Sequence, residues 1–221
     1  MRSLPLPLAL TARLAPVAVL ATAGWVMSSG PDTTTDADDR TPPDGGRPSA
    51  SASAPATRAP SRTYAAAPAP CEALAEKTVT SLVPGVKAEE GKEIPSTDKK
   101  VRRTCSWNAL KGYDYRWLDV SYEVMESDEA ARKSYTERVA DRSGGGDVPG
   151  LGDTAYSVVN LTTEDKQQTR EGTVLVRAAN AVVMVTYNGS DFESKKAPGT
   201  EEINKGAIRA AKEAVAALEE G

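Results

Sequence analysis

The chain contains no histidine among its 221 residues. This absence excludes Ser-His-Asp and Cys-His catalysis, and it removes histidine as a ligand for zinc or haem. Aromatic residues make up only 5% of the sequence, and the formal net charge is -4. A slightly acidic chain lacks the positive field that nucleic-acid binding needs, so we expect no nucleic-acid partner.

Long uncharged apolar runs are absent except near the N-terminus. Residues 1–27 carry two arginines as their only charges and end in an uncharged run of 14 residues, whereas a membrane span needs about 20. Ala21-Thr22-Ala23 matches the small-x-small pattern of signal cleavage. We interpret 1–27 as a signal peptide, with an uncleaved signal anchor as the alternative. Both place the remaining chain outside the cytoplasm, secreted or anchored to the outer face of the cytoplasmic membrane, and both limit membrane contact to this N-terminal segment.

Large apolar residues are missing between residues 28 and 70, which contain no Leu, Ile, Val, Phe, Met or Trp. Such a segment cannot bury enough apolar surface to offset the entropy of ordering it. Its Pro, Ala, Ser and Thr content predicts a disordered linker of the kind that spaces a domain from a cell wall. The small acidic cluster Asp36, Asp38 and Asp39 is interpreted as solvated, because no further ligands for calcium follow at the required spacing.

Cysteine is scarce, and both copies lie in the remaining segment, residues 71–221. Two cysteines in an exported domain, Cys71 and Cys105, favour one disulfide, with two buried free thiols as the alternative. The bridge closes a loop of 35 residues. Because the bridge lowers the conformational entropy of the unfolded chain, it stabilises the folded state by roughly 3–4 kcal/mol.

Hydrophobic periodicity predicts that residues 71–221 form a single α+β domain. The predicted order is helix, two strands, helix, three strands and helix. Tight turns between the strands indicate an antiparallel sheet packed with helices. The predicted helices lie at 71–83, 128–142 and about 200–219, and the predicted strands at 101–109, 115–125, 154–161, 172–178 and 181–187.

Four motifs follow one another along the chain: Cys71-Glu72-Ala73-Leu74 after the linker, Cys105-Ser106-Trp107, the loop 148–155 and the hairpin 174–185. Their order and spacing resemble a family of exported actinobacterial proteins of unknown function, many of them lipoproteins. The resemblance covers 71–221 and implies a PsbP-like α/β/α sandwich with a Cys71–Cys105 disulfide, without implying an activity. The chain departs from the lipoproteins because no cysteine precedes Cys71, so a lipid anchor is not implied.

Three aromatic residues, Tyr113, Tyr115 and Trp117, are the candidate ligand-binding residues. Alternation along 115–125 directs Leu118 to Val124 toward the helices and turns Tyr115 and Trp117 to the other side. They either line a shallow groove for a glycan, lipid or peptide, or lie beneath a second layer of helix. We favour the second interpretation, because a three-layer sandwich buries both faces of its sheet.

No pattern in the sequence identifies a catalytic site, and we predict no catalytic residue, metal site or cofactor. The glycines at 144–146 are not followed by the Lys-Ser/Thr of a phosphate loop, and a strand rather than a helix comes next. Asp147 and Asp153 flank this segment and could act as an acid/base pair. Without a nucleophile at a known spacing, we interpret them as turn residues.

These observations predict an exported cell-envelope protein that is not an enzyme. We expect it to bind a small apolar ligand or to dock another envelope protein. One alternative is a sensory ectodomain held by the N-terminal signal anchor. The other is a carboxylate-dependent hydrolase that uses Asp147 and Asp153.

Overall fold

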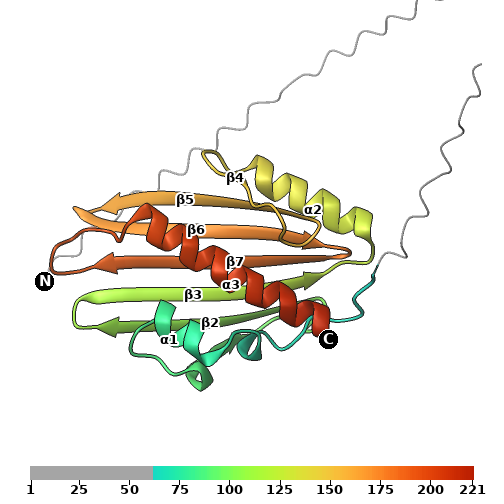
Figure 1. Ribbon diagram of the computed structural model, residues 1–221, viewed down its shortest axis with the longest axis horizontal. Coiled ribbons are helices and arrows are strands. Elements are labelled where there is room, and N and C mark those ends of the chain that lie inside the picture. The colour runs from blue at the N-terminus through green and yellow to red at the C-terminus, as the bar shows by residue number, and fades with distance from the viewer. Residues whose placement is uncertain (1–61) are drawn as a thin grey trace, which may run out of the picture. The chain divides into compact units, whose positions relative to one another are not determined.

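Seven antiparallel strands form one sheet in the computed structural model, which describes residues 62–221 (Figure 1). The order across the sheet is β1-β2-β3-β7-β6-β5-β4. Helices pack on both sides, so the predicted α+β class is confirmed. The strands are β1 (Lys92–Ile94), β2 (Arg102–Lys111), β3 (Asp114–Val124), β4 (Gly146–Asp147), β5 (Thr154–Glu164), β6 (Gln167–Ala178) and β7 (Ala181–Asp191).

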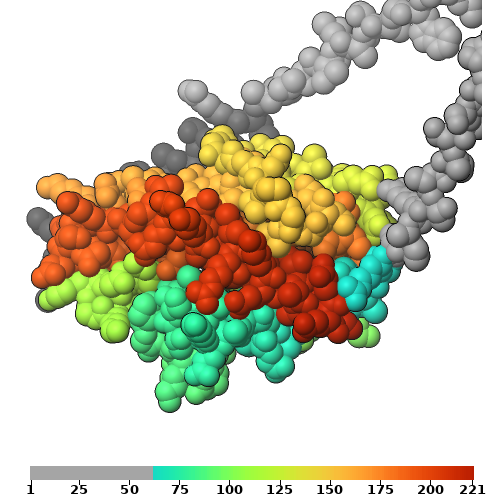
Figure 2. Space-filling view, viewed as in Figure 1, coloured from blue at the N-terminus to red at the C-terminus, as the bar shows by residue number. Residues whose placement is uncertain are grey.

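Three α-helices and two short 3-10 helices accompany the sheet. The long C-terminal helix α3 runs across β5, β6 and β7, and the α1 region lies beside it on the same side (Figures 1 and 2). The other α-helix, α2, packs on the opposite side of β6 and β7. The bounds are η1 (Pro70–Glu72), α1 (Glu76–Leu82), η2 (Ala88–Glu90), α2 (Asp128–Ala140) and α3 (Thr200–Glu220).

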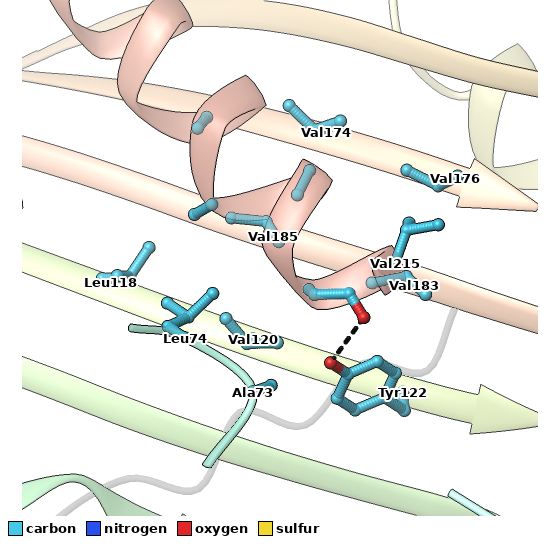
Figure 3. Packing of buried hydrophobic residues seen from close by; sticks show 14 of the residues in the cluster. Ala73, Leu74, Leu118, Val120, Tyr122, Val174, Val176, Val183, Val185 and Val215 are labelled. Atoms are coloured by element: carbon cyan, nitrogen blue, oxygen red, sulfur yellow. Dashed lines mark hydrogen bonds between the residues drawn. The ribbon is translucent and has the colours of Figure 1, made fainter. Parts of the chain in front are cut away.

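The main core lies between α3 and one face of the sheet, which we call the helix-covered face. Alternate residues of β3 point into it, and Leu118, Val120 and Tyr122 are fully buried there, as the sequence predicts (Figure 3). The Tyr122 hydroxyl donates a hydrogen bond to the Ala214 carbonyl oxygen at 2.8 Å. This bond satisfies the phenol inside an apolar layer and links β3 to α3.

Small residues allow α3 to approach the sheet closely. The buried stripe of this helix is rich in alanine, with Ala207, Ala210 and Ala214 fully buried. At Gly206, a Cβ atom would lie 2.7 Å from the ring of Tyr187, which is closer than carbon atoms can approach. Glycine is therefore needed there to seat the helix on β7.

A smaller apolar cluster covers part of the opposite face. Ala131 and Tyr135 of α2 pack against Leu175 and Val182, which alternate with the residues beneath α3. Ser127 caps this helix as predicted, because its hydroxyl accepts a hydrogen bond from the Ala130 amide at 3.1 Å. The domain therefore has helices on both sides of the sheet, while the more specific PsbP-like assignment stays a prediction.

The predicted helix at 71–83 is shorter than expected. The chain makes the 3-10 turn η1 and then adopts extended geometry at Ala75 before α1 begins. The Ala75 amide donates to the Glu213 carboxylate of α3 at 3.0 Å, and Cys71 is bridged to β2. These two tertiary contacts, which local periodicity does not report, interrupt the helix.

The hairpin of β5 and β6 extends well beyond the predicted strands. Asp165 and Lys166 form its two-residue turn with positive φ angles of 48° and 68°. The flanking residues are polar, so no apolar alternation marks them as strand in the sequence. Backbone pairing alone continues the two strands to this turn.

Residues 62–70 belong to the predicted disordered linker, but they lie against the domain. The buried Asn180 side chain accepts a hydrogen bond from the Tyr64 amide at 2.8 Å and donates one to the Tyr64 carbonyl oxygen at 2.9 Å. The Ala67 amide also donates to the Lys100 carbonyl oxygen at 3.1 Å. The predicted signal segment 1–27 and most of the linker lie outside the described residues.

Candidate binding site

The face of the sheet opposite α3 is only partly covered by a helix. The cover contributed by α2 lies over Leu175 and Val182, near the end of β3 that carries Glu123 and Val124. Toward the other end, β2, β3 and β7 present side chains with no helix above them among residues 62–221. We call this region the open face, and its strand β3 contributes Tyr115, Trp117, Asp119 and Ser121.

The structure corrects the favoured prediction that a second helix layer covers Tyr115 and Trp117. The two residues point to the side opposite Leu118, as predicted, but Trp117 is 38% exposed. Tyr115 is half-buried and contacts Phe192, with ring centroids 6.0 Å apart. Tyr113 lies in the β2–β3 turn and is 57% exposed. The aromatic residues therefore form an accessible surface.

Trp117 is fixed in place by its neighbour along the strand. Its indole Nε1 donates a hydrogen bond to the Asp119 carboxylate at 2.6 Å. Across the strands, Trp117 lies between Asn108 of β2 and Asn188 of β7. A bound ligand would thus meet a positioned aromatic ring between two amide side chains.

A groove of about 640 Å³ adjoins Asp119 on the open face. One wall is the segment 94–101, which connects β1 to β2 and includes Ser96 and Asp98. The floor carries Thr104, Ser121 and Thr186, and the Thr104 and Ser121 hydroxyls lie 2.9 Å apart. This volume is in the range of ligand pockets. The lining combines hydroxyl groups with the apolar residues Ile94, Pro95, Val101 and Met184.

The charges near the groove are mostly carboxylates. Its lining contains Asp98 and Asp119 and one basic residue, Arg102. The Arg102 guanidinium lies 3.4 Å from the Glu123 carboxylate, which also pairs with Arg138. Partial burial raises the pKa of Tyr115, and the negative charge of Asp119 raises it further. The site is therefore neutral to weakly acidic.

The two aspartates considered as an acid/base pair lie away from this groove. Asp153 accepts a hydrogen bond from the Ala179 amide at 2.8 Å and forms an ion pair with Arg177 at 3.0 Å. Asp147 belongs to the short edge strand β4 and is exposed. The contacts of Asp153 hold the loop before β5 against the β6–β7 turn, which agrees with its interpretation as a turn residue.

Cys71 and Cys105 form the expected disulfide. Cys105 is fully buried, and Trp107 packs into the same core with its Nε1 donating to the Ala88 carbonyl oxygen at 2.9 Å. The bridge fastens the segment before α1 to the middle of β2. It lies on the helix-covered face, opposite the groove.

Several residues of the site were not identified from the sequence, among them Asn108, Asn188, Thr186 and the groove wall 94–101. Alternation along β3 did place Asp119 and Ser121 on the same side as Trp117. The pairing of β3 between β2 and β7, which brings the remaining residues together, leaves no local signal in the sequence.

Residues 62–221 were compared with the requirements of membrane-spanning helices and of metal sites. No helix within residues 62–221 is long and apolar enough to cross a membrane. The same residues contain no group of three or more Cys, Asp or Glu placed to hold a metal ion.

Comparisons with known proteins do not assign the chain to a family. No protein-family model matches the chain, and no curated protein matches it. Among solved structures, the chain is similar to LpqN, described as involved in cell envelope biogenesis of Mycobacterium tuberculosis. The sequences are 13% identical, the match covers 59% of this chain and 78% of that one, and the TM-score is 0.27. A TM-score this low does not establish a common fold.

Proposed function

We propose that the chain is an exported, non-catalytic module that binds an extended polar ligand on the open face. The observation that carries this proposal is the exposed Trp117 beside a hydroxyl-lined groove, on a part of the sheet that no described helix covers. Exposed aromatic surface next to convergent polar groups is typical of binding sites.

Export is supported by the signal-like residues 1–27 and by the Cys71–Cys105 disulfide, since such bridges persist in oxidising compartments. A non-catalytic role is supported by the contacts of Asp153, whose carboxylate is already engaged by Arg177 and a backbone amide. The groove combines hydroxyl groups with the apolar residues Ile94, Pro95, Val101 and Met184, and we expect its hydroxyl groups to bind a polar ligand rather than a wholly apolar one.

Tryptophan fluorescence can test the proposal directly. In full-length chain carrying Trp25→Phe, the remaining tryptophans are Trp107, which is fully buried, and Trp117. A soluble quencher such as acrylamide therefore acts mainly on Trp117. The chain is mixed in separate samples with enzymatically solubilised peptidoglycan, phosphatidylglycerol vesicles and an unfolded carboxymethylated protein.

We expect at least one sample to protect Trp117 from acrylamide in a saturable way. Solubilised peptidoglycan is the sample that we expect to do so, because it is the one rich in extended polyhydroxyl chains. If none of the three samples protects Trp117 at any concentration, the proposed function is wrong.

A further inference from the structure

The cross-strand neighbours of Trp117 form hydrogen bonds without carrying charge. Its direct cross-strand neighbours are the amides Asn108 and Asn188. One step along the strands, Asp119 lies between the hydroxyls Ser106 and Thr186. Directly opposed side chains in a sheet have Cβ atoms about 5 Å apart, so these groups surround the ring closely.

The arrangement along β3 is elongated. Tyr115, Trp117, Asp119 and Ser121 follow one another on the same face, with aromatic rings at one end and hydroxyl groups at the other. Six residues of strand span about 20 Å. A polymer lying along the strand contacts both ends, whereas a compact ligand contacts only one.

The charges of the site disfavour anionic partners. In the part of the groove that the structure describes, the one guanidinium is that of Arg102, and Glu123 already pairs with it. The carboxylates of Asp98 and Asp119 add negative potential. Phospholipid headgroups and nucleic acids need clustered basic residues, whereas the described lining of the groove holds one, Arg102, and Lys92 of β1 lies opposite Ser106.

The site also lies far from the point where the spacer joins the domain. Tyr64 is bound by Asn180, which adjoins the pairing of Val124 with Ala181 at one end of β3 and β7. Trp117 lies seven residues from Val124 along β3, or about 23 Å. Tyr64 therefore lies near the opposite end of β3 from the aromatic residues.

From these observations we propose that the ligand is an uncharged polysaccharide strand, with one sugar ring stacked on Trp117 and the next rings following β3 into the groove. The amides of Asn108 and Asn188 and the hydroxyl of Thr186 supply the hydrogen bonds to its hydroxyl groups. This inference rests on the proposed function and names its ligand class. A peptide that adds to a sheet edge through backbone hydrogen bonds does not fit, because this site lies on a sheet face.

The test uses a panel of neutral oligosaccharides: chitohexaose, cellohexaose, a galactan hexamer and an arabinan hexamer. Each is titrated into the full-length chain carrying Trp25→Phe, with acrylamide quenching and calorimetry as readouts. We expect at least one to bind saturably, protect Trp117 and keep its affinity between 50 mM and 500 mM salt. The cationic hexamer of glucosamine and phosphatidylglycerol vesicles are titrated in parallel.

Matched variants locate the binding. Trp117→Ala is expected to weaken the affinity about tenfold or more, as for a central aromatic contact, while Trp117→Phe retains most of it. Leu161→Ala is the control, because Leu161 is also an exposed apolar residue, at 48%, but lies on β5 away from the site. Equal loss in Trp117→Ala and Leu161→Ala contradicts the proposed position.

The outcomes separate this inference from the proposed function. If no neutral oligosaccharide binds while vesicles, unfolded protein or the cationic hexamer protect Trp117, the open face is a binding site and the polysaccharide inference is wrong. If solubilised peptidoglycan protects Trp117 and no neutral oligosaccharide does, the inference is also wrong, because the lactyl groups or peptides that the neutral panel lacks are then required. If nothing protects Trp117, both proposals fail.

Discussion

The two faces of strand β3 are built from alternating residues of one short sequence, yet they differ in what they provide. On the helix-covered face, Leu118, Val120 and Tyr122 are fully buried beneath α3 (Figure 3). On the open face, Trp117 is exposed and Asp119 is half-buried beside a groove. Burial of apolar surface stabilises the fold, whereas exposed polar groups contribute little to stability. One strand therefore supplies both the core and the candidate site.

Removal of the disulfide should have the largest effect on stability. The bridge lies on the helix-covered face alone, so its removal tests whether the two faces are independent. Replacing both cysteines, Cys71→Ala with Cys105→Ala, removes the constraint on the unfolded chain. The free energy of unfolding is expected to fall by roughly 3–4 kcal/mol in a urea titration. A fall below about 1 kcal/mol contradicts a stabilising role of that size. Ligand affinity of the folded fraction should not change, since the bridge lies opposite the groove.

Substitutions at two adjacent residues of β3 compare how much each face contributes to the free energy of unfolding. Leu118→Ala leaves a cavity beneath α3 and is expected to lower the free energy of unfolding by about 3 kcal/mol. Trp117→Ala, one residue away, should cost about 1 kcal/mol or less, because the ring is already partly solvated. Urea titrations of the two variants, compared with the unchanged chain, measure the difference. Similar costs for both would show that the open face is covered in solution.

Alkaline pH tests the helix-covered face through Tyr122 and Tyr187, which are more deeply buried than Tyr115. Burial raises the pKa of Tyr122 and of Tyr187 on the helix-covered face above the ordinary value of 10.0. Their folded-state pKa values exceed those of the unfolded chain, so their contribution to stability is complete below pH 10 and is lost as the pH rises above it. Thermal unfolding between pH 8 and 12 should show this decline. The double variant Tyr122→Phe with Tyr187→Phe should decline less steeply, and an unchanged slope would contradict the assignment.

Removal of the Thr186 hydroxyl is expected to have the smallest effect on stability of these substitutions. Thr186→Ala removes one polar group from the groove floor and should change the free energy of unfolding by no more than about 0.5 kcal/mol. The affinity for any neutral oligosaccharide that binds the unchanged chain should fall a few-fold, and calorimetry measures this change. The control is Thr162→Ala, an exposed hydroxyl of β5 outside the groove. An effect on stability without an effect on affinity would mean that Thr186 is structural.

The sequence predicted the α+β class, most strands and the disulfide, because each leaves a local or compositional signal. Alternation along 115–125 correctly separated the side of Leu118 from that of Trp117. The interruption of the first helix near Ala75 was not predictable, because it depends on Glu213 far along the chain. The polar ends of the β5–β6 hairpin were missed because backbone pairing there has no apolar pattern.

The candidate site was only partly predictable for the same reason. Tyr113, Tyr115 and Trp117 stood out because aromatic residues are rare in this chain. Whether a helix covered them depended on where α2 packs, and the expectation of full cover on both faces was wrong. Thr186 and Asn188 join the site through pairing of β7 with β3, which are distant in sequence. Long-range register of this kind cannot be derived from periodicity alone.

Side-chain footprinting of the full-length chain tests the central claim most directly. Hydroxyl radicals modify exposed aromatic, sulfur-containing and aliphatic side chains, and mass spectrometry locates them with and without solubilised peptidoglycan or the neutral oligosaccharides. The account predicts ligand-dependent protection at Trp117 on the open face and at Met184, which lines the groove beside the α2 cluster, with Leu161 unchanged. Protection confined to Leu161 or to the outer surface of α2, with Trp117 modified as before, would contradict it.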